Sequence, residues 1–282
     1  MKWKMKALLA GALAAAVVIA GGCGGGDAQK QAGSAAAAPK GKVLQQIKDR
    51  GTLIVGTAAG FPPYEFIDTS KADKTVVGID IALAQKVADK LGVKLEVQDM
   101  NFSALLSSIA ANKIDIAIAA INASDERKKA VDFSKPYMHS PHILLIRKED
   151  AGKYKTLEDF RGKRIGAQKS TLQEKLAREQ VPEAKVVALD KVADTLIELE
   201  TGKIDAVASQ GVVAQQYLIM NKDLADSGVK FENVKSSSSV AVPKGNEDLV
   251  KIINEVIDEN SGNMEGWIKE YSALAVANAQ KK

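Results

Sequence analysis

The stretch Asn112–Tyr137, NKIDIAIAAINASDERKKAVDFSKPY, decides how the rest of this chain is interpreted. Its apolar run from Ile114 to Ile121 is too short for a buried helix and predicts a strand in the core. Ser124 or Asp125 is a natural N-cap, so we expect the strand to lead into the N-terminus of a helix. Free backbone N–H groups at such an end form a site for an anion.

Arg127 lies about one turn into that predicted helix. Its planar guanidinium can hold a carboxylate through two parallel hydrogen bonds. The alternative is an exposed helical arginine beside Lys128 and Lys129, and this segment alone does not separate the two interpretations.

The composition is that of a soluble globular protein with one large domain or two of ordinary size. The chain has 282 residues, of which 46% are apolar and 26% charged. The net charge of +4 falls to +1 without residues 1–22, because three lysines and no acids leave with them. Net charge therefore gives little support to binding of nucleic acid or of a membrane surface.

The N-terminal segment predicts export. Lysines at positions 2, 4 and 6 precede the apolar run Ala7–Ala20, and small residues follow, which is the pattern of a signal peptide over residues 1–22. Ile19–Cys23 resembles a bacterial lipobox, in which Cys23 becomes the lipid-bearing first residue, although Ala20 stands where leucine is more frequent. The alternative is a secreted protein cut nearby. Cys23 is the only cysteine, which excludes an internal disulfide. Residues 23–42 are predicted to be a flexible tether.

Beyond the tether, strands and helices are expected to alternate. The chain predicts strands at 52–57, 93–97, 142–147, 164–167, 185–188, 204–209 and 240–242, and helices at 43–50, 80–91, 104–112, 157–161, 171–180, 192–201, 212–221, 247–260 and 263–271. Asp80 is expected to be the N-cap of the second helix. The alternation predicts an α/β fold with mainly parallel sheets.

The chain also contains an internal echo. Asn112–Asp115, NKID, precedes IAIA, and Gly202–Asp205, GKID, precedes AVAS. We interpret this as the same helix-to-strand step used once in each of two similar lobes, with coincidence as the alternative. Asp115 and Asp205 are expected to cap these turns rather than to form a catalytic pair.

Two signals of chemistry are weak or missing. His139 and His142 are three residues apart, but Pro141 lies between them and no cysteine or acid cluster accompanies them, so we do not expect a metal site. The common catalytic motifs for phosphate binding, metalloproteases and nucleophilic serines are absent. No cofactor is expected.

From about Leu53 to Tyr271 the chain resembles one family. The matching segments are Gly56-Thr57, Phe61–Phe66, Gly78–Asp80, Phe102-Ser103, Asp125–Arg127, Val131–Ser134, Pro136-Tyr137, Gly202–Ala206 and Trp267. They resemble the family 3 extracellular solute-binding proteins, the receptors that deliver polar amino acids to ABC importers.

The resemblance implies a type II periplasmic-binding-protein fold, with two α/β lobes, two crossover strands and a ligand cleft closed by hinge motion. Lobe 1 would be residues 43–136 and 239–282, lobe 2 residues 142–233, and the hinge crossovers residues 137–141 and 234–238.

The resemblance also implies a binding site for an amino acid. Arg127 would hold the α-carboxylate, and Phe61 and Phe102 would enclose the rest of the ligand. The other implied ligand-binding residues are Ala119, Ala120, Asn122, Gln168, Thr171, Leu172 and Gln210.

This chain departs from the family pattern where the ligand's amine is held. Gln210 stands where the family usually has an aspartate, and Ala58 or Ala59 where many members have a second acid. An amide leaves only a neutral hydrogen bond, which is weaker. Either another acid such as Glu65 or Glu174 substitutes, or the ligand is a small carboxylate that needs no amine.

The resemblance implies an extracytoplasmic, lipid-anchored monomer that works with the transmembrane subunits of an ABC permease and binds no nucleic acid. The alternative function is an enzyme, since the fold also resembles periplasmic cyclohexadienyl dehydratases. Glu174 would then be the catalytic acid.

Overall fold

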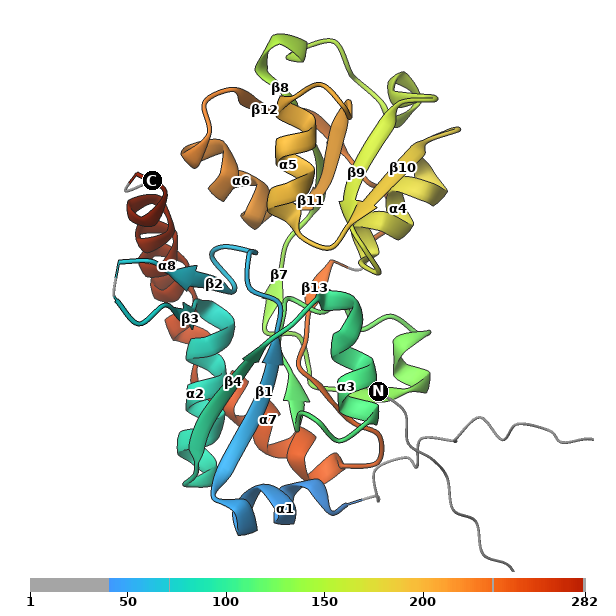
Figure 1. The fold of residues 1–282 in the computed structure, drawn as a ribbon. Helices are drawn as coiled ribbons and strands as arrows, with labels where there is room; N and C mark the ends of the chain where they lie inside the picture. The colour runs from blue at the N-terminus through green and yellow to red at the C-terminus, as the bar shows by residue number, and fades with distance from the viewer. Residues whose placement is uncertain (1–40, 71, 235, 281–282) are drawn as a thin grey trace, which may run out of the picture. The chain divides into compact units, whose positions relative to one another are not determined.

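The computed structural model describes residues 41–70, 72–234 and 236–280. The predicted signal peptide, Cys23 and nearly all of the predicted tether lie outside these ranges. Two five-stranded sheets organise the described residues, and helices pack against both (Figure 1). Among the described helices, none is both long and apolar enough to cross a membrane.

The two sheets repeat one topology, which confirms the predicted pair of α/β lobes. In each sheet three strands are parallel, and the last two run antiparallel to their neighbours. The first sheet has the order β4 (Lys94–Asp99), β1 (Thr52–Thr57), β5 (Ile116–Ala117), β14 (Ala241–Pro243), β6 (Val131–Phe133). The second has the order β10 (Lys185–Leu189), β9 (Arg164–Gln168), β11 (Ala206–Gln210), β8 (His142–Arg147), β12 (Leu224–Lys230).

The helices are α1 (Val43–Arg50), α2 (Ile79–Leu91), α3 (Leu105–Ala110), α4 (Leu172–Gln180), α5 (Val192–Glu200), α6 (Gly211–Met220), α7 (Glu247–Glu259) and α8 (Met264–Ala279). Most of the helices have an apolar face, whereas α6 and α8 have little one-sided apolar pattern. Gly51 and Gly92 end α1 and α2 in the left-handed conformation, which glycine adopts without strain. The last helix runs to Ala279, beyond the predicted end at Tyr271.

Two short antiparallel ribbons were not predicted. One joins β2 (Phe66–Asp68) and β3 (Thr75–Val77). The other pairs β7 (Met138–His139) with β13 (Ser237–Ser238). In the chain, β7 leads directly into the second sheet and β13 leads back into the first, so the two passages between the sheets are paired with each other.

The opening stretch of the sequence differs from its prediction in two places. Residues Ile114–Ile121 are all buried, but only Ile116–Ala117 pair as a strand, because Ala120 takes a left-handed conformation with φ of 47°. The predicted helix after Ser124 is a single 3₁₀ turn, Arg127–Lys129. It stops there because Val131 already pairs with Pro243 of β14, so the helical anion site predicted here is wrong.

The internal echo is confirmed at the level of hydrogen bonds. Asp115 Oδ2 accepts from Ile54 N at 2.7 Å, and Asp205 Oδ2 accepts from Arg164 N at 2.8 Å. Each aspartate also donates its own N–H to the carbonyl of that same partner residue, at 2.8 Å in both lobes. Both acids thus fasten a strand to its parallel neighbour, as expected of structural rather than catalytic groups.

The two lobes also touch through helices that lie far apart in the sequence. From α6, Gln216 Nε2 donates to the carbonyl of Ser272 in α8 at 3.1 Å. The hydroxyl of Tyr217 donates to the carbonyl of Gly60 at 3.0 Å. These bonds join the lobes at a place separate from the β7–β13 ribbon.

Equivalent glycines in the two sheets are expected to be equally intolerant of a methyl group. A Cβ on Gly56 would lie 2.4 Å from Ile114 Cδ1, and a Cβ on Gly166 would lie 2.4 Å from Ile204 Cδ1. Gly56→Ala and Gly166→Ala should therefore each lower the free energy of unfolding by about 1–3 kcal/mol through overpacking. Urea unfolding measures this.

The matched rescue is Ile114→Val with the first change and Ile204→Val with the second, since valine lacks the colliding Cδ1. Gly266→Ala, in a helix with no atom within 4 Å of the new Cβ, is the control and should not lower the free energy of unfolding, because alanine favours the helix more than glycine does. Full stability of the single variants, or failure of both rescues, would contradict this packing.

Candidate functional site

All ten residues predicted to bind the ligand line one small cavity, of about 20 Å³. They come from both lobes, from loops, from strand ends, from 3₁₀ turns and from the start of α4. The lining is completed by His142 and Gln173, which were not among the predicted ligand-binding residues. The predicted residues present are Phe61, Phe102, Ala119, Ala120, Asn122, Arg127, Gln168, Thr171, Leu172 and Gln210.

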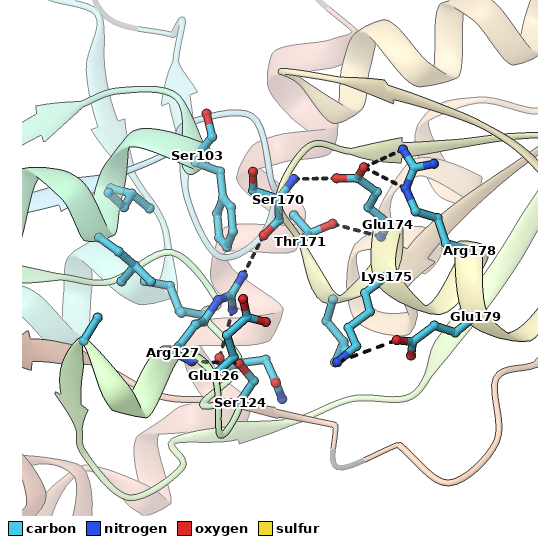
Figure 2. Close-up of a pocket in the computed structure, with 17 residues that line it drawn as sticks. Ser103, Ser124, Glu126, Arg127, Ser170, Thr171, Glu174, Lys175, Arg178 and Glu179 are labelled. Atoms are coloured by element: carbon cyan, nitrogen blue, oxygen red, sulfur yellow. Dashed lines mark hydrogen bonds and ion pairs between the residues drawn. The ribbon is translucent and has the colours of Figure 1, made fainter.

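A larger cavity of about 660 Å³ adjoins the small one and shares Phe102, Asn122, Arg127, Thr171 and Leu172 with it (Figure 2). Sites for small molecules are typically about 300–1,000 Å³, whereas a space of about 20 Å³ holds roughly one water molecule. A ligand that reaches the small cavity therefore needs the lining residues to move apart.

Arg127 lies where the two cavities meet. Its Nη1 donates to the carbonyl of Asn122 at 2.9 Å, and its Nη2 donates to the carbonyl of Ser170 at 2.8 Å (Figure 2). The guanidinium carbon lies 5.3 Å from the centre of the Phe102 ring, within the range of a cation–π contact. The Ser170 bond joins the two lobes.

Arg127 is charged and makes hydrogen bonds to carbonyl groups, and the neighbouring Glu126 carboxylate only partly offsets the effect of burial on it. Among the residues that the structure describes, no carboxylate forms an ion pair with it, and burial lowers the pKa of its guanidinium. A guanidinium has five N–H donors, and the two bonds to carbonyls leave others free for an incoming anion.

The N-terminus of α4 faces the same place. Thr171 caps the helix by accepting from Glu174 N at 3.2 Å. Leu172 and Gln173, the first two residues of α4, have N–H groups without partners inside the helix, and both residues line the small cavity. They add backbone donors to the positive charge of Arg127.

Two predicted residues direct their side chains away from an incoming ligand. Asn122 Nδ2 donates to the carbonyl of Ser237 in β13 at 3.3 Å. Gln168 Nε2 donates to the carbonyl of Asp190 at 3.1 Å, and the carbonyl of Gln168 accepts from the Thr171 hydroxyl at 2.6 Å. In this arrangement both amides support the backbone around the cavity.

Asp80 is not the N-cap that the sequence predicts. Gly78 precedes the helix, and Asp80 lies inside its first turn, fully buried. Its Oδ2 accepts from Ala120 N and its Oδ1 accepts from the Tyr137 hydroxyl, each at 2.8 Å. One carboxylate therefore holds the left-handed Ala120 of the cavity and also the start of the passage to the second sheet.

Glu65 lies beside Asp80 and is also buried. Burial, and then the Asp80 carboxylate, raise the pKa of Glu65 well above its usual range. Burial raises the pKa of Asp80 to about 6, against the opposing effect of its hydrogen bonds to Ala120 and Tyr137. Lobe 1 thus keeps two acids beneath the cavity that hold protons more tightly than exposed acids do.

These groups make stability depend on pH with a defined sign. Asp80 has an ordinary value of 3.8 and a pKa of about 6 in the folded chain, so between these values the folded state binds more protons than the unfolded state. The contribution of Asp80 to the free energy of unfolding therefore falls as pH rises from about 4 to 6. The contribution of Glu65 falls in the same direction, over a pH range that begins near its ordinary pKa of 4.5. His142 has the opposite effect on stability. Burial lowers its pKa from 6.5 to about 4, so its contribution to the free energy of unfolding is lost as pH falls from 6.5 to about 4.

We therefore expect the free energy of unfolding of the ligand-free wild type to decrease between pH 4.5 and 6, since two groups outweigh one. In the variant Glu65→Gln/Asp80→Asn the decrease should become clearly shallower, because His142 is then opposed by Asp115, whose pKa burial also raises. Urea unfolding at several pH values measures both slopes. The acids with lowered pKa values, Asp150, Asp159 and Asp205, titrate below this window. Parallel curves for the two proteins would contradict the assignment.

The two histidines occupy different surroundings. His139 is exposed in β7, and His142 is buried at the start of β8. Among the described residues, no three His, Cys, Asp or Glu side chains are grouped so that they could hold a metal ion. The sequence signal that bears on a cavity role for His142 was its position at the start of a predicted strand.

The repeated sheets, the paired crossovers and the cavity lined from both lobes define a two-lobed solute-binding protein of type II topology. The family model of the bacterial extracellular solute-binding proteins, family 3, matches residues 53–272, and the chain belongs to this family.

Similar proteins agree with this class. The chain is 34% identical over 218 residues to the L-cystine-binding protein TcyJ of Escherichia coli, covering 77% of this chain and 80% of that protein. A solved amino-acid ABC transporter substrate-binding protein from Streptococcus pneumoniae, bound to L-arginine, superposes with a TM-score of 0.79 at 36% identity, covering 82% of this chain and 98% of the other. The ancestral amino acid-binding protein AncCDT-1, a precursor of cyclohexadienyl dehydratase, superposes with a TM-score of 0.73 at 30% identity, covering 81% and 98%.

Proposed function

We propose that this protein is the receptor of an amino-acid ABC importer, which captures a free amino acid between its lobes and delivers it to a membrane permease. The observation that carries the proposal is Arg127, a partly buried cation without a carboxylate partner among the described residues, beside the N-terminus of α4. A carboxylate is the anion that this pair of features suits. The names of the similar proteins support an amino acid as the ligand that carries this carboxylate.

The proposed site consists of the ten residues predicted from the sequence. Arg127 binds the α-carboxylate, helped by the backbone of Thr171 and Leu172. Phe61 and Phe102 enclose the rest of the ligand. Ala119, Ala120, Asn122 and Gln168 contribute through backbone or amide groups, and Gln210 approaches the amine.

Capture proceeds by hinge closure in this proposal. Residues 43–136 and 239–282 form one lobe and residues 142–233 the other, with crossovers at 137–141 and 234–238. The pairing of β7 with β13 supports the position of the hinge. The small volume of the inner cavity and the Arg127–Ser170 bond across the lobes support a need for opening before a ligand can enter.

The N-terminal segment completes the proposed receptor. A signal peptide at residues 1–22, lipidation of Cys23 and a tether at residues 23–42 would hold a monomeric receptor to the outer side of the membrane, beside its permease. The extracellular nature of the family supports export. Mass spectrometry of the mature protein tests the anchor, since an acylated N-terminal Cys23 is expected.

We propose binding without catalysis. Glu174 is the acid that the enzymatic alternative would use. Both of its carboxylate oxygens accept hydrogen bonds from residues in α4 or next to it. Its Oε2 accepts from Ser170 N at 2.7 Å, and its Oε1 accepts from Arg178 Nε and Nη2 at 3.1 and 2.8 Å. A general acid needs a free proton-bearing oxygen within reach of its substrate, so these bonds favour a role in capping.

Calorimetric titration of the chain from Gly24, unfolded and refolded to remove bound ligand, tests the proposal. The panel contains the twenty amino acids, L-cystine, and carboxylates lacking the amine. Micromolar or tighter binding of an amino acid is expected. If only the carboxylates lacking the amine bind, the ligand is a simple carboxylate and not an amino acid. If prephenate or arogenate is turned over, the protein is an enzyme and not a receptor.

A further inference from the structure

Two buried side chains of the small cavity have polar atoms without partners. Among the described residues, His142 Nδ1, His142 Nε2 and Gln210 Oε1 make no hydrogen bond. His142 is 3% exposed and Gln210 is 2% exposed. A buried polar atom without a hydrogen-bond partner destabilises the protein, and a bound ligand group that pairs with it would remove that destabilisation.

The two residues form a single feature of the second sheet. Gln210 at the end of β11 is the direct cross-strand partner of His142 at the start of β8. Partners in an antiparallel pair project from the same face of the sheet, with Cβ atoms about 4.5–5.5 Å apart. Both side chains line the cavity that also contains Arg127.

In the structure, the amide nitrogen of Gln210 faces a neighbouring hydroxyl. Gln210 Nε2 lies 3.4 Å from Ser238 Oγ in the crossover strand β13 and donates to it. The carbonyl oxygen Oε1 is therefore the atom that remains available. It is an acceptor, and it suits a ligand group that donates.

His142 offers a second acceptor and no charge. Burial lowers the pKa of its imidazole to about 4, so the ring is neutral at pH 7. A neutral imidazole has one N–H donor and one nitrogen with a free lone pair. Among the lining residues of the small cavity the one charged side chain is Arg127, which an α-carboxylate would neutralise.

We propose that His142 contacts the bound amino acid, and that His142 and Gln210 together accept N–H hydrogen bonds from its α-amine as an uncharged pair. The inference rests on the proposed function, since it names how the second polar group of the same ligand is held. It makes His142 a determinant of specificity that replaces part of the missing carboxylate. Binding of the amine then depends on hydrogen bonds rather than on an ion pair.

Matched ligands isolate the amine. L-arginine is compared with δ-guanidinovalerate and L-cystine with dithiodipropionate, which differ only by loss of the α-amines. Each is titrated calorimetrically into the wild type and into His142→Leu, His142→Gln and Gln210→Leu. His139→Leu, at the other histidine of the chain, is the control for removing an imidazole outside the cavity.

We expect His142→Leu to weaken binding of the amino acid that the wild type binds by about 10-fold or more, because a hydrogen bond to a charged group is lost. Binding of the amine-free analogue should change less than about 2-fold. His142→Gln, which restores an acceptor, should recover part of the loss, and His139→Leu should match the wild type.

Equal losses for both members of a pair, or no loss for either, would overturn the role of His142 and leave the proposed receptor standing. If the wild type binds neither L-arginine nor L-cystine nor any other compound of the calorimetric panel, the proposed function is wrong, and so is this inference.

Nitrogen-15 NMR of histidine-labelled protein gives an independent readout that a purely structural role would not move. The chain has two histidines, so the His139→Leu spectrum assigns the signals. The unprotonated nitrogen of His142 should shift when L-arginine or L-cystine binds, and much less with the matching analogue. An unchanged His142 signal in the presence of a bound amino acid would overturn the contact.

Discussion

Replacing Arg127 by alanine is expected to weaken binding of the amino acid by at least about 30-fold, while the chain remains folded. The expectation follows from the position of the guanidinium between the two cavities, with donors left over after its bonds to Asn122 and Ser170. Removing one partner of a buried, hydrogen-bonded charge pair costs about 2–5 kcal/mol, which converts to this range of affinity. Calorimetric titration measures the loss.

Two variants make the result specific. Arg127→Lys keeps the charge but loses the planar fork, so its affinity should lie between those of the wild type and Arg127→Ala. Lys128→Ala removes the neighbouring cation, whose side chain is 54% exposed, and should leave the affinity unchanged. Equal affinities of Arg127→Ala and Lys128→Ala would exclude Arg127 from the site.

Asp80→Ala is expected to lower the free energy of unfolding by about 2–5 kcal/mol, the largest stability effect of the changes considered. Ala120 N–H and the Tyr137 hydroxyl would both lose their acceptor inside the protein, and each unpaired group costs about 1–3 kcal/mol. The affinity for the amino acid should fall as well, because Ala120 would lose the bond that holds its left-handed conformation. Urea unfolding and titration of the same samples measure the two effects.

Asp89→Ala is the matched control, because it changes an exposed aspartate of the same helix and should shift stability by less than about 0.5 kcal/mol. Tyr137→Phe removes only one of the two donors and should cost about 1 kcal/mol. If Asp80→Ala is as stable as Asp89→Ala, the buried carboxylate does not hold the two segments together.

The sequence predicted the composition of the cavity better than the geometry of its parts. The segment from Asp125 to Tyr137 identified Arg127 through its residue types and order, which do not depend on whether the backbone forms a helix or a 3₁₀ turn. The same segment gave the wrong secondary structure, because local capping signals compete with pairing of Val131 to β14, which lies more than a hundred residues away.

Asp80 and His142 show what local patterns cannot predict. An aspartate before an apolar helix reads as a cap, and only the fold brings Ala120 and Tyr137 to its two oxygens. His142 became a cavity residue only when β8 and β11 were paired in register with Gln210. Both roles depend on contacts between distant segments, for which a single sequence carries no periodic signal.

The hydrogen bonds from α6 to Ser272 and to Gly60 affect how quickly such a receptor releases its ligand. They are made between parts of the protein and not to a ligand, so they favour the joined arrangement of the lobes whether or not the cavity is filled. Because a ligand reaches the inner cavity only after its lining residues move apart, molecules held in the joined arrangement do not take up a ligand. The apparent dissociation constant equals the intrinsic one divided by the fraction of molecules that are open, so these bonds slow capture and weaken the apparent affinity. The same bonds must break before the lobes separate, which slows escape and leaves the docking partner to provide the energy for unloading.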